Sequence, residues 1–406
     1  MTPLRTVTEA VGDAAPRRTL FANFDTGRAY TFVLMTVPYS PGLEGVVAAQ
    51  TEISEVDGQN GRLIYRGGYL IHEVADRSFE EIAYLLWNGE LASGAQLREF
   101  EQKLAEARAL KPAARAALAG LPRDADPMDA LRTLLSAQGA APGCPKPGME
   151  DAIAATAVTP TAIAAYYRHQ RGEPAVEPRA DLGHAANFLF MLDGREPDPD
   201  RVRYLQSYLV LLADHGLNAS TFTARVVCST GSDLWSSVVA AVGALKGPAH
   251  GGAATAAMNM IERVGGPDRA EQFVIDALDR KERLMGFGHR VYRTYDPRAK
   301  ILRDLCREAN RGFYDVAFKV EETALRELLA RHPERPNATN VDYYSAGVLA
   351  AAGFPKEFFA CVFAASRMAG WTAHVLEYIA KDGRIIRPAS QWTGPDPEKR
   401  AAVLTS

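Results

Sequence analysis

Residues 355–381 read PKEFFACVFAASRMAGWTAHVLEYIAK, and Gly383 follows this apolar segment. The segment predicts one long helix that the glycine ends. Similar helical segments, each with a capping residue before it or a glycine after it, are expected at residues 79–88, 233–245, 252–264 and 297–310. The chain shows neither internal repeats nor strands that alternate with helices, so the sequence predicts a mainly α fold.

A β-hairpin is predicted only between residues 46 and 69, VVAAQTEISEVDGQNGRLIYRGGY, where apolar and polar residues alternate around a DGQNG turn. The preceding residues 1–41 mix Pro, Gly, Arg and Asp around one short apolar run. They contain no recognisable motif, and we interpret them as an N-terminal extension.

The composition is that of an ordinary globular protein. Of the 406 residues, 47% are hydrophobic and 23% are charged, and the net charge is −3. This length predicts two domains, and the near-neutral charge argues against a nucleic-acid-binding protein. Four scattered cysteines without a CxxC pair indicate reduced thiols. Because we find no secretory signal and no apolar run of about 18 residues, we expect a cytoplasmic protein that does not bind a membrane.

Three of the eight histidines, His215, His250 and His289, lie in turns marked by glycine or aspartate between apolar helices. Neighbouring glycines let a ligand approach closely, and a histidine near a helix start, as expected for His250, is biased toward its neutral form. Each of the three could instead be a hydrogen-bonded, half-buried histidine. A metal site is not favoured, because the spacing matches neither HxxxH nor HExxH.

Three arginines and one aspartate complete the candidate set. Arg367 stands within the long apolar helix, where a buried guanidinium needs an anionic partner. Arg298 in TYDPRA and Arg387 in RIIRP are suited to bidentate binding of carboxylates, although ordinary salt bridges would explain both. Asp342 precedes an apolar helix and, considered alone, would be interpreted as the N-cap of that helix.

Several long motifs, in the same order, resemble the citrate synthase family. They run from GLEGVVAAQTEIS at Gly42 to RIIRP at residues 384–388 and cover most of the chain. Between them lie LADHGLNASTF, KGPAHGG, MGFGHRVYRTYDPRA, NVDYYS and SRMAGWTAH. The resemblance implies a citrate-synthase-like two-domain helical fold, with a large domain of residues 42–251 and 355–406 and an inserted small domain of residues 252–354.

The resemblance also implies a role for each matching residue. His250 would meet the thioester carbonyl of an acyl-CoA, His289 would polarise the keto oxygen of oxaloacetate, and Asp342 would remove the methyl proton. Oxaloacetate would further be bound by His215, Arg298, Arg367 and, from the neighbouring subunit, Arg387. Contacts to CoA are implied for Leu284, Met285, Gly286, Phe287, Gly288 and, at a phosphate, Arg293.

The implied reaction condenses acetyl-CoA with oxaloacetate and water to give citrate and CoA, in a homodimer that shares its sites between subunits. It needs no metal or redox cofactor, because each step moves only protons and carbon-bound electrons; the CoA thioester is a substrate. A 2-methylcitrate synthase that uses propionyl-CoA is an alternative, as is a catalytically silent homologue that only binds CoA or a dicarboxylate. The acyl-chain preference stays open because GPAHGGAAT differs from the family's GPLHGGANE at Ala254 and Thr255, and NVDYYSA differs from NVDFYSG.

Overall fold

The computed structural model describes residues 18–23, 28–33, 39–289, 291–334, 337–381 and 383–395. The chain divides into two compact units. One is Thr51–Ile386, and the other consists of the terminal segments that precede and follow it.

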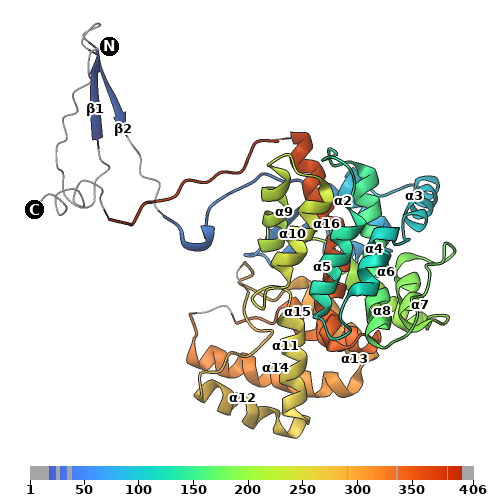
Figure 1. Cartoon of the computed structure of the whole chain (residues 1–406). Coiled ribbons are helices and arrows are strands. Elements are labelled where there is room, and N and C mark those ends of the chain that lie inside the picture. The colour runs from blue at the N-terminus through green and yellow to red at the C-terminus, as the bar shows by residue number, and fades with distance from the viewer. Residues whose placement is uncertain are drawn as a thin grey trace, which may run out of the picture. The chain divides into compact units, whose positions relative to one another are not determined.

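The terminal unit contains an antiparallel hairpin of β1 (Arg18–Asn23) and β2 (Arg28–Val33), shown in Figure 1. The sequence interpretation placed β structure only between residues 46 and 69, which is wrong for this segment. Both strands, RTLFAN and RAYTFV, contain the Thr, Phe, Tyr and Val residues that favour strands. The mixed composition of residues 1–41 obscured this signal.

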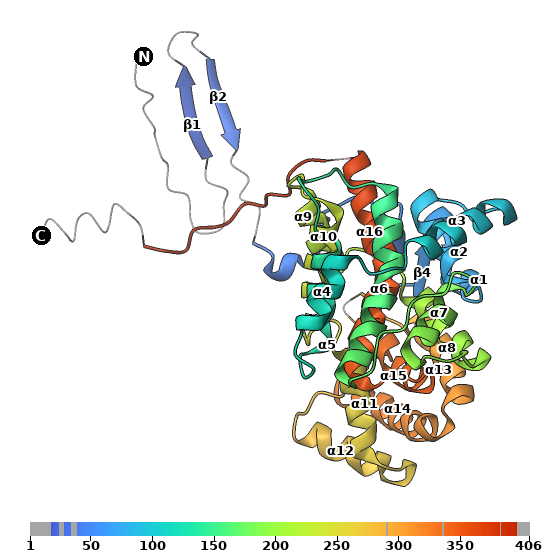
Figure 2. The same ribbon diagram turned by 45° about the vertical axis from the view of Figure 1, so that its right-hand side comes forward.

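The larger unit is mainly helical, as predicted (Figures 1 and 2). Its α-helices are α1 (Ile71–Val74), α2 (Phe79–Asn88), α3 (Gly94–Glu106), α4 (Pro112–Gly120), α5 (Pro127–Gln138), α6 (Met149–Gln170), α7 (His184–Asp193), α8 (Pro199–Leu212), α9 (Ala219–Cys228), α10 (Leu234–Leu245), α11 (Ala253–Val264), α12 (Ala270–Asp279), α13 (Pro297–Ala309), α14 (Arg311–Arg331), α15 (Val341–Ala351) and α16 (Phe359–Lys381). Short 3-10 helices across the described chain are η1 (Pro41–Leu43), η2 (Arg66–Gly68), η3 (Pro267–Arg269) and η4 (Lys356–Phe358). Within the described residues, no helix is both long and apolar enough to cross a membrane.

The hairpin predicted between residues 46 and 69 is confirmed. Strand β3 (Ser54–Asp57) pairs antiparallel with β4 (Arg62–Tyr65), and β5 (Tyr69–Leu70) adds to the other edge of β4. The turn of this hairpin lies against the segment that follows His289, because the backbone N–H of Arg293 donates to the carbonyl of Gly58 at 2.9 Å. A side chain at Gly58 would place its Cβ 2.1 Å from the carbonyl oxygen of Val291, so only glycine fits this contact.

The predicted helix signals hold at both ends of α2, where Ser78 and Glu81 form a capping box and Gly89 ends the helix with a φ of 89°. Asp296 caps α13, as expected. The long C-terminal helix begins later than predicted: Pro355 is followed by the 3-10 turn η4, and α16 starts only at Phe359. This difference reflects the common use of a 3-10 turn at a helix terminus.

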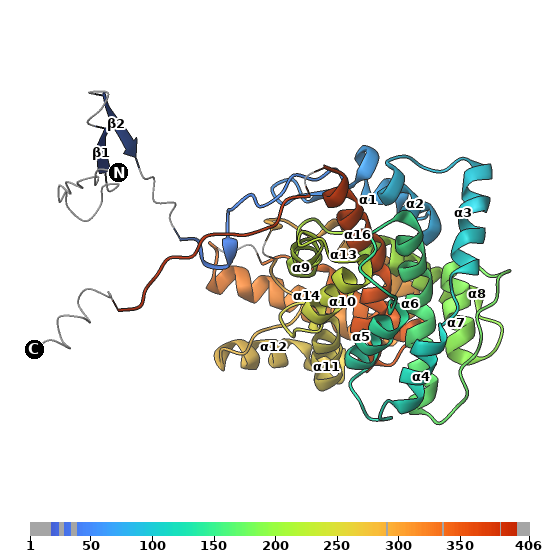
Figure 3. The same ribbon diagram turned by 45° about the horizontal axis from the view of Figure 1, so that its top comes forward.

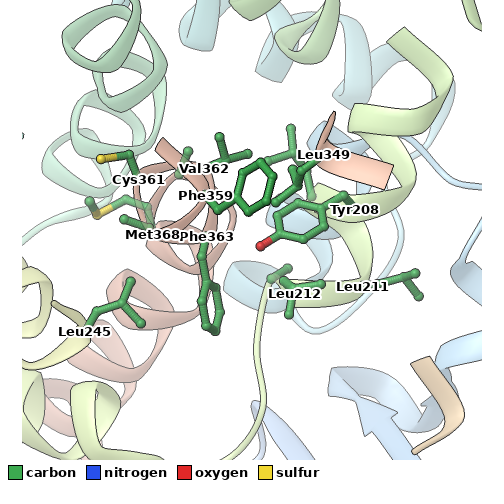
Figure 4. Packing of buried hydrophobic residues seen from close by; sticks show 14 of the residues in the cluster. Tyr208, Leu211, Leu212, Leu245, Leu349, Phe359, Cys361, Val362, Phe363 and Met368 are labelled. Carbon is green, nitrogen blue, oxygen red and sulfur yellow. The ribbon is translucent and has the colours of Figure 1, made fainter. Parts of the chain in front are cut away.

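Helix α16 is the centre of the larger unit. It packs against α6, α8, α9 and α10, and Figure 2 shows it beside α6. Figure 4 shows Phe359 and Val362 of α16 in one apolar cluster with Tyr208 of α8 and Leu349 of α15. Helix α8, which lies beside α7 in Figure 3, ends directly before a loop that carries a candidate histidine.

Helices α11, α12 and α14 lie together at one end of the larger unit (Figures 1 and 2). All three belong to residues 252–354, which the family resemblance assigns to a small domain. The exact division of the chain at residues 251/252 and 354/355 stays a prediction.

Candidate active site

Six of the seven polar side chains proposed for the active site come together in the larger unit. They lie on the loop after α8, the turn between α10 and α11, the loop before α13, and helices α13, α15 and α16, and they are His215, His250, His289, Arg298, Asp342 and Arg367. The rings of His215 and His289 meet edge to face, with centroids 5.4 Å apart. The charges of Arg298 and Arg367 both act on the pKa of His215 and on that of Asp342, so the two arginines face the same space.

Backbone hydrogen bonds hold the ring of His289 through its Nδ1 edge. Its Nδ1 accepts hydrogen bonds from the backbone N–H groups of Val291 and Tyr292, both at 3.0 Å. Because Nδ1 acts as an acceptor, the neutral ring carries its proton on Nε2. The hydroxyl of Tyr292 in turn lies 3.3 Å from Nε2 of His215, which ties the two histidine loops together.

All three histidines have depressed pKa values and are neutral near pH 7. Burial, followed by the charge of Arg298, lowers the pKa of His289 to about 4. Burial, followed by the charge of Arg367, lowers the pKa of His250 to about 4. For His215 burial is again the first cause and holds the pKa well below its ordinary value. The sequence predicts a neutral His250 because of its place near a helix start. The neutral form has a different cause, since burial and the charge of Arg367 lower the pKa of His250.

Ser220 orients the ring of His250. Its Oγ lies 2.8 Å from Nε2 of His250 and accepts a hydrogen bond from Nε1 of Trp371 at 3.0 Å. The hydroxyl has a single proton, which can go to Oδ1 of Asn218 at 2.8 Å or to His250. Directed at His250, it leaves the ring proton on Nδ1, available to a ligand oxygen.

Arg298 is held by Asp296 at the start of α13. The guanidinium donates from Nε to Oδ1 at 3.1 Å and from Nη2 to Oδ2 at 2.8 Å, and both side chains are almost fully buried. Asp296 also accepts the backbone N–H of Arg298 at 3.0 Å, as the helix cap. One carboxylate therefore fixes both the helix start and the direction of the arginine.

Arg367 is only 1% exposed. Its Nε donates to the carbonyl of Leu212 at 2.8 Å, and its guanidinium lies over the ring of Phe363 at 4.8 Å. Burial lowers the pKa of Arg367 to about 10, with Asp214 opposing this shift. Among the described residues, no carboxylate lies within ion-pair distance of Arg367. The anionic partner that the sequence led us to expect is therefore not a neighbouring side chain of the described residues, and Asp214 is a more distant counter-charge.

Asp342 is the second residue of α15, and the alternative interpretation of it as the N-cap is wrong. Asn340 is the N-cap, because its Oδ1 accepts the backbone N–H of Asp342 at 3.1 Å. Burial raises the pKa of the Asp342 carboxyl to about 6, against the opposing charges of Arg298 and Arg367. Its carboxylate is thus free of a capping function and is a stronger base than an ordinary aspartate.

The glycine loop implied to bind CoA, Leu284 to Gly288, is paired with the segment before Asp342. Gly288 donates its N–H to the carbonyl of Ala338 at 2.8 Å, and Asn340 donates its N–H to that of Gly286 at 2.9 Å. Gly286 has a φ of 87°, and a Cβ there would lie 2.5 Å from the ring of Tyr343. Backbone hydrogen bonds and close packing therefore fix the position of this loop, called the CoA loop below, relative to the helix of the proposed base.

A hollow of about 240 Å³ adjoins this loop and is lined in part by Asn259, Arg263, Phe273, Leu284 and Met285. Phe287 of the loop is buried, and its ring packs against that of Tyr343 at a tilt of 54°, with centroids 5.0 Å apart. A larger hollow, about 590 Å³, lies between α8 and α13 and is lined by none of the proposed site residues. The smaller hollow is thus lined by two residues with implied CoA contacts, Leu284 and Met285, whereas the larger one is lined by none.

Two further implied residues are exposed. Arg293 is exposed, and its backbone N–H makes the contact to the β3–β4 turn described above. Arg387 is exposed and belongs to the terminal unit. Their roles at a CoA phosphate and in a neighbouring subunit's site stay predictions.

The spacing of the histidines did not suggest that His215, His289 and Asp296 meet, yet their ligand atoms lie within 4.8 Å of one another. Such a group could hold a metal ion. However, both carboxylate oxygens of Asp296 already accept from Arg298, and Nδ1 of His289 accepts two backbone donors. The adjoining positive charges of Arg298 and Arg367 favour an anion over a cation.

Sequence reasoning missed the side chains that hold these groups in place. Ser220 and Trp371 lie within the motifs LADHGLNASTF and SRMAGWTAH, so their position was the available signal. Asp214 is fully buried and receives a hydrogen bond from Ser54 at 2.5 Å. Nothing in the local sequence indicates that contact, because the two residues lie far apart along the chain.

Comparisons with known proteins identify the family of the chain. The family model "Citrate synthase, C-terminal domain" matches residues 42–389. The citrate synthase of Haloferax volcanii is 43% identical over 364 residues, covering 87% of this chain and 95% of that protein. The 2-methylcitrate synthase of Mycobacterium tuberculosis H37Rv is 39% identical over 365 residues, covering 87% and 90%. The solved ternary complex of Thermoplasma acidophilum citrate synthase with carboxymethyl-CoA and oxaloacetate has a TM-score of 0.83 at 32% identity, covering 88% of this chain and 97% of that one.

The chain is thus an acyltransferase with a mainly helical fold. It belongs to the citrate synthase family, whose members use CoA thioesters as substrates.

Proposed function

We propose that this chain condenses acetyl-CoA with oxaloacetate and water to give citrate and CoA. The observation that carries the proposal is the half-buried carboxylate of Asp342, with a pKa raised to about 6, which shares the influence of the buried arginine Arg367 with neutral His250. The similarity to the Haloferax volcanii citrate synthase and to the Thermoplasma acidophilum complex supports it.

The first step removes a proton from the methyl group of acetyl-CoA. A carboxylate with an ordinary pKa of about 3.9 is a poor base for such a weak acid, and the raised pKa of Asp342 improves it. His250, as the neutral Nδ1–H form, donates to the thioester oxygen and stabilises the enol or enolate as it forms. The base and the hydrogen-bond donor act together, so losing either one stops the step.

The second step forms the carbon–carbon bond. Arg298 and Arg367 hold the carboxylates of oxaloacetate and fix its orientation, with His215 as a further contact. The nucleophilic carbon attacks the keto carbon, and the Nε2–H of His289 donates to the keto oxygen and protonates it. Water then hydrolyses the resulting citryl-CoA thioester, which releases citrate and CoA.

Use of propionyl-CoA to form 2-methylcitrate is the second candidate function. The 39% identity to the Mycobacterium tuberculosis 2-methylcitrate synthase favours it, as does the position after the His250 turn where family members carry Asn and this chain carries Ala254. Ala254 is 4% exposed, and the next residue, Thr255, donates its hydroxyl to the carbonyl of Lys356 at 2.8 Å. A smaller side chain beside the thioester site could leave room for one more methyl group.

We further propose a homodimer in which Arg387 of each subunit completes the oxaloacetate site of the other. The position of Arg387 in the RIIRP motif supports this arrangement, as does its exposure outside the larger unit. A buried cluster with only two arginines would otherwise lack the third cation that the family resemblance implies.

A CoA-release assay with a thiol reagent tests the proposed function. Purified protein is incubated with oxaloacetate and either acetyl-CoA or propionyl-CoA, and kcat/KM is compared between the two. Higher kcat/KM with acetyl-CoA supports citrate synthesis, and the reverse supports 2-methylcitrate synthesis. Absence of CoA release with either substrate, in protein that still binds oxaloacetate by calorimetry, would show a catalytically silent homologue.

A further inference from the structure

A carboxylate outside the proposed reaction, Glu321, lies buried within α14 at 4% exposure. It accepts hydrogen bonds from three hydroxyl groups. Tyr295 and Thr339 donate to Oε1 at 3.0 and 2.5 Å, and Tyr344 donates to Oε2 at 2.5 Å. Among the described residues, no lysine, arginine or histidine lies within ion-pair distance of Glu321, so these hydroxyl groups hold the carboxylate.

Two of the three donors, Tyr295 and Tyr344, sit on segments that carry a proposed site residue, and the third, Thr339, directly precedes the N-cap of α15. Tyr295 directly precedes the Asp296–Arg298 pair at the start of α13. Tyr344 lies on the same helix as Asp342. Glu321 therefore joins the segment of the proposed base to that of an oxaloacetate-binding arginine.

Thr339 adds the CoA loop to this arrangement. It forms a β-bridge with Phe287, and its carbonyl accepts the backbone N–H of Asp296 at 3.4 Å. Thr339 thus connects the carboxylate of Glu321 with the CoA loop.

Burying a carboxylate without a cation costs free energy of folding unless hydrogen bonds compensate for the lost water. An apolar residue at this position of α14 would avoid that cost. A fully satisfied polar network, in contrast, fixes a unique arrangement of the elements that it joins. We propose that Glu321 is a positioning residue that sets the relative placement of the CoA loop, Arg298 and Asp342. The proposal rests on the proposed condensation reaction, because it concerns the same site.

The three donors make the proposal testable segment by segment. Tyr344→Phe frees the helix of the proposed base, so kcat and the exchange of acetyl methyl hydrogens in deuterated water should fall roughly 10-fold. Tyr295→Phe frees the segment before Arg298 and should raise the KM for oxaloacetate by a similar factor. Thr339→Val releases from Glu321 the residue that pairs with the loop of residues 284–288, so it should raise the KM for acetyl-CoA.

Two further variants serve as controls. Tyr166→Phe removes another buried hydroxyl, which donates to the carbonyls of Pro122 and Ala125 away from the site, and should leave all kinetic constants unchanged. Glu321→Gln keeps the size and most acceptor capacity of the side chain, so it should fold and retain more activity than Glu321→Ala. Thermal unfolding of every variant separates lost stability from altered kinetics.

The expected result is three different kinetic changes from three donors that share one acceptor. If the three variants behave like Tyr166→Phe, or if all lose kcat equally without a change of either KM, Glu321 is only structural and the proposal is wrong. A wild-type protein that releases no CoA would instead overturn the proposed function. Oxaloacetate affinity, compared by calorimetry between wild type and Tyr295→Phe, still decides the positioning role in that case.

Discussion

Replacing Asp342 by asparagine changes one charge and almost nothing else. Asn340 caps α15, so the substitution removes no cap. Asparagine has nearly the same size as aspartate but cannot accept a proton at neutral pH. If Asp342 is the base, turnover should fall about 10²- to 10⁴-fold, the usual contribution of a positioned proton-transfer group.

The same substitution should stabilise the fold at neutral pH. Burial raises the pKa of Asp342 from 3.8 to about 6, which corresponds to a cost of about 3 kcal/mol when the group is ionised. Near pH 4 the carboxyl is protonated in the folded chain and only about half ionised in the unfolded chain, so the cost is small there. It grows as the pH rises to about 6 and is constant above. The free energy of unfolding of Asp342→Asn should therefore exceed that of the wild type by up to about 3 kcal/mol at pH 8 and by little near pH 4.

Turnover is measured by CoA release, and stability by urea denaturation at both pH values and equal protein concentration. The matched control is Asp200→Asn, since Asp200 is likewise the second residue of its helix but its side chain is 73% exposed. That control should change neither activity nor stability appreciably. Wild-type turnover in Asp342→Asn would refute the proposed base, and lower stability at every pH would show that its carboxylate is structural.

Three further predictions concern the pH profile, a buried ion pair and the proposed dimer. Because Asp342 must be ionised, kcat/KM for acetyl-CoA should fall as the pH drops through about 6; a midpoint near 4 in a pH–rate profile would contradict this. Glu377→Ala should lower the free energy of unfolding by about 3–5 kcal/mol in urea denaturation, because it leaves buried Arg225 without its partner, and an unchanged midpoint would speak against this pair. Inactive Arg387→Ala and His289→Ala chains should recover part of the activity when refolded together; no recovery in proven heterodimers would exclude a shared site.

Most of the local structure could be predicted from the sequence, because local rules determine it. The capping box of Ser78 and Glu81, the cap at Asp296 and the β3–β4 hairpin all depend on residues that are close along the chain. The cap of α15 shows where such rules end. Asn340 and Asp342 are both good capping residues, and only the backbone geometry decides between them.

The supporting contacts of the site could not be predicted, because they join segments that are distant in sequence. The bond between Ser220 and His250 depends on how α9 packs beside the turn after α10. Glu321 lies on a helix whose sequence shows nothing unusual, and its three donors come from the start of α13 and from the start of α15. Sequence motifs point to the residues that react, whereas the residues that position them can be identified only in the packed structure.

In the free protein, burial and the two buried arginines shift the pKa of the proposed base in opposite directions. Arg298 and Arg367 lower the pKa of Asp342, burial raises it, and burial dominates. A dicarboxylate bound between the arginines would offset their positive charge and add negative charge near Asp342. Both effects raise the pKa of Asp342 further, so the carboxylate becomes a stronger base once oxaloacetate is in place. The electrostatics of the site therefore favour activation of acetyl-CoA after its acceptor has bound, which couples the two halves of the proposed reaction without any additional group.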